Sequence, residues 1–161
     1  MKNSLRLSLF AVLSALATTA SAAPMCMTSG TYADLLMTNS GGGCMINDKL
    51  FSDFSFGASA SGGAMVATAS SFGYNVIANV PTDIGFRFNF SMAAFGGQSS
   101  DVLLGYLVTG PNITSNHLAM AGGTLGGGVA SVSETYCKGA SITSCQPSQA
   151  SSFFASSGSR L

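Results

Sequence analysis

The sequence GGGCMINDKLFSDFSF, residues 41–56, sets the architecture that we expect for the chain. Three glycines lead to Cys44, and the polar run 47–49 then separates the apolar residues on either side. Asn, Asp and Gly are typical of turns, and the alternating Phe54 and Phe56 are typical of a strand with one buried face. The stretch therefore predicts a turn held at Cys44 and a strand after it, which is architecture rather than chemistry.

The same period of two continues beyond this stretch. It is clearest at residues 83–92, where the polar residues share one face and the other face consists of Ile84, Phe86, Phe88, Phe90 and Met92. This pattern predicts a strand with one wet face, whereas residues 101–108 are apolar on both faces and predict a central strand. A further short strand is expected at residues 65–69. Strands at roughly ten-residue spacing, without intervening helices, indicate an all-β fold, either an antiparallel sandwich or a barrel.

Residues 1–22 predict a secretory signal peptide. Two basic residues precede an uncharged apolar run at residues 7–17, and the small residues Ala20 and Ala22 fit a cleavage site. The apolar run is too short to cross a bilayer, which needs about 20 residues. We therefore expect residues 23–161 to form a secreted chain, extracellular or at the cell surface, with no membrane span. Its length suits a single β-sandwich domain.

One short helix is expected near the mature N-terminus, at residues 31–37 (TYADLLM). Thr31 is placed to cap its first turn, and Asp34 follows three residues later, which is the spacing of a capping box. No other part of the mature chain shows a helical pattern.

The charge pattern argues against nucleic-acid binding. The full chain has six Lys plus Arg and six Asp plus Glu, and loss of Lys2 and Arg6 leaves four basic residues against six acidic ones. The remaining basic residues are scattered singly, so the basic stripe of a nucleic-acid-binding protein is missing. Charged residues protect exposed strand edges against pairing with other chains, and this chain has few of them. The sequence is therefore compatible with self-association.

Four cysteines remain after export: Cys26, Cys44, Cys137 and Cys145. An even number of cysteines in an oxidising compartment predicts two disulfides, and four cysteines allow three pairings. Proximity in the sequence favours Cys26 with Cys44, and the two late cysteines with each other, because shorter loops close at a lower entropic cost. A zinc site or a catalytic thiol is the alternative, but the chain has no C-x-x-C spacing and its one histidine is His117.

The chain lacks the motifs of familiar catalytic sites. It has no G-x-S-x-G, H-E-x-x-H or EF-hand spacing, and the GGTLGGG run at residues 122–128 lacks the lysine and the helix of a phosphate-binding loop. His117 acting as a base for a serine would make the protein a hydrolase, but a lone histidine on a predicted strand is more typical of a structural residue. We therefore expect no enzyme, no catalytic residue and no cofactor.

Two binding functions remain as alternatives. Acidic residues lie at or near the ends of predicted strands, where a sandwich can gather oxygen ligands for calcium: Asp48, Asp53, Asp83, Asp101 and Glu134. Because no D-x-D cluster supplies several ligands at once, we favour solvated loops and no metal site. Carbohydrate binding is the second alternative, although the chain has no Trp to stack on sugar rings.

An ordered series of short motifs resembles a known class of exported proteins. The motifs are TYADLL at residues 31–36, the stretch at 41–56, SDVLLGYLVTG at 100–110 and SVSETYCKG at 131–139. The series covers most of the mature chain and resembles the β-sandwich proteins of environmental bacteria that usually end in a PEP-CTERM sorting tail. The resemblance implies an Ig-like or jelly-roll sandwich, a location outside the cell or on its surface, and a family whose molecular activity is largely undefined.

The C-terminus departs from that pattern. The tail of the family carries a Pro-Glu-Pro signature, an apolar helix and a basic cluster, whereas this chain finishes SSFFASSGSRL, residues 151–161. We therefore expect either a chain truncated at its C-terminus or one that is released without sorting. Together, the observations predict a non-catalytic secreted, cell-surface or extracellular-matrix protein, with extracellular polysaccharide or matrix components as its partners.

Overall fold

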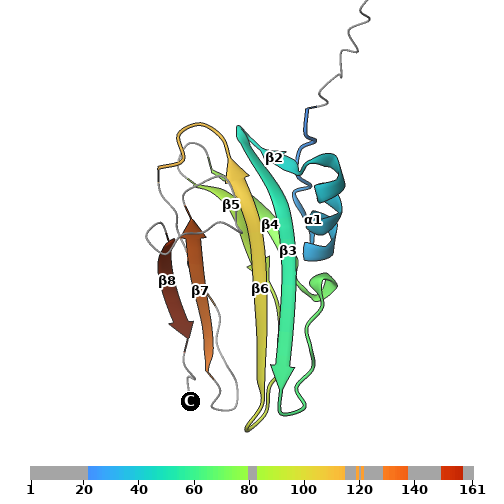
Figure 1. The fold of residues 1–161 in the computed structure, drawn as a ribbon, viewed down its shortest axis with the longest axis vertical. Helices are drawn as coiled ribbons and strands as arrows, with labels where there is room; N and C mark the ends of the chain where they lie inside the picture. The colour runs from blue at the N-terminus through green and yellow to red at the C-terminus, as the bar shows by residue number, and fades with distance from the viewer. Residues whose placement is uncertain are drawn as a thin grey trace, which may run out of the picture.

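The computed structural model describes residues 22–79, 83–114, 119, 121, 129–137 and 150–157, which are arranged as Figure 1 shows. In chain order the elements are β1 (Ser29–Thr31), α1 (Tyr32–Thr38), η1 (Asn39–Gly41), β2 (Cys44–Ile46), β3 (Lys49–Ser61), η2 (Ala69–Ser71), β4 (Gly73–Asn79), β5 (Asp83–Asn89), β6 (Ser99–Thr109), β7 (Ala130–Cys137) and β8 (Ala150–Ser157). The strands pair antiparallel in three groups, with the orders β1-β4-β5, β2-β3-β6 and β7-β8. The predicted all-β antiparallel fold with one short α-helix is confirmed.

The two three-stranded sheets pack face to face around an aromatic core. The ring centroid of Phe86 in β5 lies 4.9 Å from that of Phe51 and 5.9 Å from that of Phe54, both in β3. The buried side chains are Tyr32, Leu35, Cys44, Ile46, Phe51, Phe54, Phe72 and Tyr74. These contacts place the core between the sheets, as in a β-sandwich. The Ig-like or jelly-roll character of its connections stays a prediction.

Helix α1 begins where the sequence predicts. The backbone N–H and the hydroxyl of Thr31 both donate to Oδ2 of Asp34, at 2.7 and 2.8 Å, and these hydrogen bonds lower the pKa of the Asp34 carboxyl. The helix packs Tyr32 and Leu35 into the core, and the Tyr32 hydroxyl donates to the carbonyl of Gly105 in β6 at 2.8 Å. Burial raises the pKa of Tyr32 well above its ordinary value, so this hydroxyl stays a donor.

A bulge in β3 brings two phenylalanines to the same face. Phe51 and Phe54 are three residues apart, so a regular strand would point them to opposite faces. The pairing of β3 with β6 shifts between Ser52 and Ser55, and Asp53 adopts a φ of 53°. Asp tolerates this left-handed conformation better than most residues do. The extra residue turns both rings inward, where they are 2% and 3% exposed.

Asn39 supplies the backbone of the bulge with a hydrogen-bonding partner. Its Nδ2 donates to the carbonyl of Phe54 at 2.8 Å, and its Oδ1 accepts from the N–H of Phe54 at 2.9 Å. The carboxamide thus offers the donor and the acceptor that a neighbouring strand would offer. Since Asn39 follows α1 directly, it ties the end of the helix to the middle of β3.

We expect Asn39→Ala to lower the free energy of unfolding by about 1 to 3 kcal/mol, because it leaves the N–H and the carbonyl of Phe54 without partners. Asn39→Asp should not restore the loss, since a carboxylate cannot donate to the carbonyl. Urea unfolding followed by circular dichroism measures both variants. Ser40→Ala changes the neighbouring exposed residue and serves as the control. A loss in Asn39→Ala no larger than in this control would contradict the role.

Three sequence predictions about the strands were wrong. In the described part of the chain, β6 lies at the end of its sheet rather than at the centre, and Leu103 is 73% exposed. Two apolar faces make a strand easy to bury, but they do not determine whether a further strand pairs with it. The strand expected at residues 65–69 is irregular chain that leads into η2. The ring of Phe90, just beyond β5, is 47% exposed although it stacks on Phe72.

Candidate binding surface on strands β4 and β5

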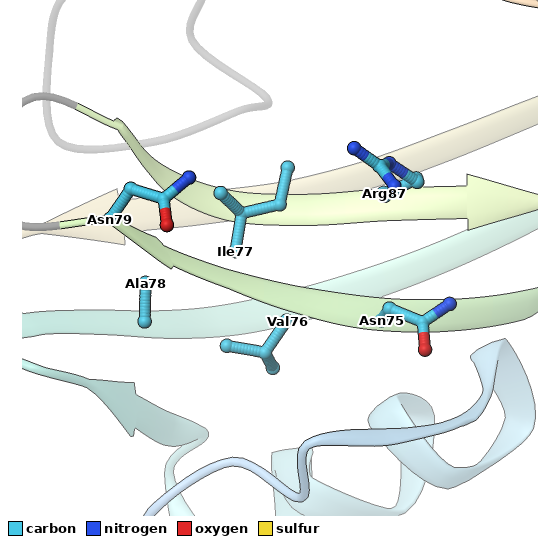
Figure 2. Close-up of a pocket in the computed structure, with 6 residues that line it drawn as sticks. All are labelled: Asn75, Val76, Ile77, Ala78, Asn79 and Arg87. Carbon is cyan, nitrogen blue, oxygen red and sulfur yellow. The ribbon is translucent and has the colours of Figure 1, made fainter.

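A shallow hollow of about 180 Å³ lies on strands β4 and β5 (Figure 2). Five of the residues that line it come from β4 and one from β5: Asn75, Val76, Ile77, Ala78, Asn79 and Arg87. The side chains of Ile77 and Arg87 stand on one side of the two strands, while Val76 points to the other side and packs against the core. Because Arg87 and both asparagines are exposed, the hollow opens on the outer face of the sheet.

The register of the two strands explains the hollow. Ile77 lies directly opposite Gly85, where an added Cβ would meet no atom within 4 Å. Asn75 lies opposite Arg87 on one side of this pair, and Asn79 ends β4 on the other side. Cβ atoms of directly opposed residues are about 5 Å apart. Polar side chains therefore stand on both sides of a small apolar floor formed by Ile77.

Arg87 is the cationic group of this surface. It is exposed and forms no ion pair with any described residue, whereas Lys49 and Asp48 pair with each other at 2.7 Å. A planar guanidinium binds carboxylate, sulfate or phosphate groups through two parallel hydrogen bonds. Asp83 lies four residues from Arg87 along β5, about 13 Å away. The surface therefore has a positive end beside Asn75 and an acidic end.

The mixture of groups suits a ligand with both polar and apolar surface. The asparagine side chains at positions 75 and 79 each offer donors and an acceptor, and Arg87 adds charged donors. Ile77 offers an aliphatic contact for C–H groups. A sugar ring has this character, with hydroxyl groups around its rim and C–H groups on its faces. These groups can contact the rim and the faces of such a ring, and Arg87 can contact an anionic substituent on it.

The acidic residues predicted as alternative calcium ligands lie on separate elements. Asp48 pairs with the neighbouring lysine at the turn between β2 and β3, and this hydrogen bond lowers the pKa of its carboxyl. Asp53 lies in the β3 bulge, Asp83 begins β5 and Asp101 lies in β6. The side chain of Glu134 lies outside the described residues. Among those residues, no group of three or more His, Cys, Asp or Glu side chains is placed to hold a metal ion.

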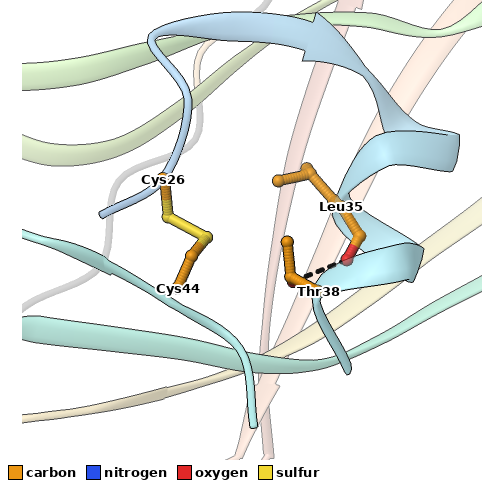
Figure 3. Close-up of a disulfide and its surroundings, with 4 residues drawn as sticks. All are labelled: Cys26, Leu35, Thr38 and Cys44. Carbon is orange, nitrogen blue, oxygen red and sulfur yellow. Dashed lines mark hydrogen bonds between the residues drawn. A yellow bond between two sulfur atoms is a disulfide. The ribbon is translucent and has the colours of Figure 1, made fainter. Parts of the chain in front are cut away.

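The predicted disulfide between Cys26 and Cys44 is present (Figure 3), with an S–S distance of 2.04 Å and a Cα–Cα distance of 4.8 Å. It lies beside α1, where the Thr38 hydroxyl donates to the carbonyl of Leu35 at 2.7 Å. Cys44 is 1% exposed and belongs to the buried core. The bridge is therefore structural, and it joins the N-terminal segment to β2.

Several residues named in the sequence analysis cannot be placed in the site. His117, the glycine run 122–128 and Cys145 lie outside the described residues, as does the side chain of Cys137. The second disulfide and the structural role of His117 therefore stay predictions. No helix in the described part of the chain is long and apolar enough to cross a membrane.

The alternation of polar and apolar residues predicts which side chains of β4 and of β5 point outward. It does not predict that these side chains form one surface. It places Asn75 and Ile77 on one face of β4 and Arg87 on the polar face of β5. It does not reveal that Ile77 lies opposite Gly85, because the register depends on the turn between the strands. No family model, no curated protein and no solved structure matches this chain.

Proposed function

We propose that this chain is a non-catalytic protein of the cell surface or extracellular matrix, exported through its N-terminal signal peptide, and that it binds extracellular polysaccharide through the hollow on β4 and β5. The predicted signal peptide supports export. The sandwich with the Cys26–Cys44 bridge suits an oxidising compartment. The resemblance to PEP-CTERM-type proteins points to the same location.

The observation that carries the binding proposal is the exposed Arg87, which has no ion-pair partner among the described residues and lies opposite Asn75. Its positive charge is available to a ligand, and the pairing of β4 with β5 fixes the position of its backbone beside Asn75. The apolar Ile77 follows along β4, and Asn79 completes the same face. A polysaccharide that carries carboxylate groups, a polyuronate, matches this order of charged, apolar and polar groups.

Isothermal titration with alginate, a polymer of uronic acids, tests the proposal against dextran, an uncharged polymer. We expect binding of alginate alone. Arg87→Ala should weaken it about tenfold or more, because a hydrogen bond to a charged group contributes about 1.5 to 3 kcal/mol. Arg87→Lys should recover part of the affinity, since lysine keeps the charge but loses the planar fork.

A matched pair of asparagines controls for the site. Asn75→Ala removes an amide from the hollow and should weaken binding, whereas Asn89→Ala removes one from the same sheet beyond the hollow and should not. Binding of alginate that is equal in wild type and Arg87→Ala would show that the hollow is not the site. Failure of the wild type to bind alginate would refute the polyuronate proposal.

A calcium-dependent module is the alternative that the acidic residues leave open. A ligand bound by the native state alone raises the unfolding temperature, with a stabilisation of about 2.7 kcal/mol at a hundredfold excess over Kd. A rise in Tm with millimolar calcium that disappears in Asp48→Asn or Asp101→Asn would favour this alternative over the polysaccharide proposal.

A further inference from the structure

Two methionines, Met25 and Met45, lie side by side at the N-terminal edge of the sandwich, although they are twenty positions apart in the sequence. Met25 forms a parallel β-bridge with Met45 of β2, in which the Met45 N–H donates to the carbonyl of Pro24 at 2.7 Å and the Cys26 N–H donates to the carbonyl of Met45 at 2.8 Å. Residues paired in a bridge point their side chains to the same side of the sheet. Met27 follows two positions after Met25.

The disulfide shows to which side of the sheet Met25 and Met45 point. Cys26 and Cys44 are the direct neighbours of the two bridged methionines, and their side chains meet on the inner side, where Cys44 is 1% exposed. Alternation therefore turns the bridged methionines outward. Met25 is 66% exposed and Met27 is 57% exposed. The Cys26–Cys44 bridge and the two backbone hydrogen bonds thus hold exposed Met25 beside half-buried Met45, with exposed Met27 two residues further along the chain.

The thioether is a soft, uncharged ligand that favours monovalent copper over hard cations. Cβ atoms of bridged residues such as Met25 and Met45 are about 5 Å apart, and Met27 is two residues from Met25 along the chain, so their Cα atoms are at most about 7 Å apart. A methionine side chain has three rotatable bonds, so the three sulfur atoms can converge on one ion while the backbone stays in place. We propose that Met25, Met27 and Met45 form a binding site for a soft monovalent cation of the Cu(I) type.

The proposal is independent of the polysaccharide surface. None of the three methionines lines the hollow on β4 and β5. The site would give an exported protein a means to hold copper at its surface without a thiol.

Titration with Ag(I), an air-stable soft ion, into protein labelled with 13C at the methionine methyl groups tests the site. We expect the methyl resonances of Met25, Met27 and Met45 to shift together and to saturate at one equivalent. Cu(I), kept reduced with ascorbate under nitrogen, should shift the same resonances. Met25→Leu and Met45→Leu should each weaken Ag(I) binding by about tenfold or more, the scale seen when a metal site loses support.

Met37→Leu and Met65→Leu are matched controls, because Met37 in α1 and Met65 in the irregular chain before η2 are 71% and 85% exposed. Leucine conserves volume, and an unchanged Tm without metal will show that each variant folds. Ag(I) affinity should be unchanged in both controls. Shifts of equal size at all exposed methionines, or no shift below one equivalent, would overturn the proposal, as would full affinity in Met25→Leu.

Discussion

Phe86→Ala is expected to lower the free energy of unfolding by about 3 kcal/mol, the lower end of the cost of removing a core phenylalanine ring, because the partly buried side chain packs against the core. The ring lies at the centre of the aromatic cluster. It contacts five aromatic side chains drawn from both sheets, with centroids between 4.9 and 5.9 Å away: Phe51, Phe54, Tyr74, Phe88 and Tyr106. A loss of this size is a large part of the roughly 5 to 15 kcal/mol that stabilises a typical domain.

Arg87→Ala is the control for this prediction, since Arg87 is the next residue of β5 and points to the opposite face. Its effect on stability should stay within about 0.5 kcal/mol, as for most surface changes. Urea unfolding followed by circular dichroism measures both variants. If Phe86→Ala does not fold at all, Phe86→Leu gives a smaller, measurable loss. Equal losses at positions 86 and 87 would show that the orientation of β5 is wrong.

The double variant Cys26→Ala, Cys44→Ala is expected to lose about 3 kcal/mol of stability in the chain-entropy model, because the bridge closes a short loop and restricts the unfolded chain. The two cysteines are 18 residues apart in the sequence. The loss should appear as a lower urea midpoint, with a somewhat steeper slope because the unfolded chain without the bridge exposes more surface. An unchanged midpoint would contradict a structural role for the bridge.

Alkylation of free thiols is the control for the double cysteine variant. The denatured, non-reduced wild type should take up no label at Cys26 or Cys44. Dithiothreitol added to the double variant reports separately on any bridge between the two late cysteines, because the first bridge is absent there. The two measurements distinguish the effect of one disulfide from the effect of reduction in general.

The parts of the fold that could be predicted depend on neighbours in the sequence. The period of two between Ile84 and Phe88 determines which face of β5 is buried, since successive strand residues point to opposite sides. Thr31 and Asp34 define the start of α1 because the cap forms within one turn. The Cys26–Cys44 pairing follows from a short loop. Each of these signals depends on a few adjacent residues, so each can be recognised in the sequence without knowledge of the fold.

The parts that could not be predicted depend on partners far along the chain. The inward direction of both Phe51 and Phe54 needs a bulge at Asp53, and the bulge is held by Asn39 from beyond the helix. No local pattern links Asn39 to a strand fifteen residues away. The hollow likewise depends on the register that sets Ile77 opposite Gly85. Cross-strand geometry of this kind depends on how the whole chain folds and cannot be recognised in any short stretch of the sequence.

The segment between Pro24 and Thr31 is hydrogen-bonded to both sheets. The carbonyl of Pro24 accepts from β2, the carbonyl of Thr28 accepts from the N–H of Val76 in β4, and β1 then continues the pairing with β4. Removal of the chain up to Thr31 would therefore take a hydrogen-bonded neighbour from β2 and from β4 at once. Bare strand edges are templates for intermolecular pairing. A chain cut after this segment should therefore pair with a second copy along the bared edges more readily than the uncut chain does.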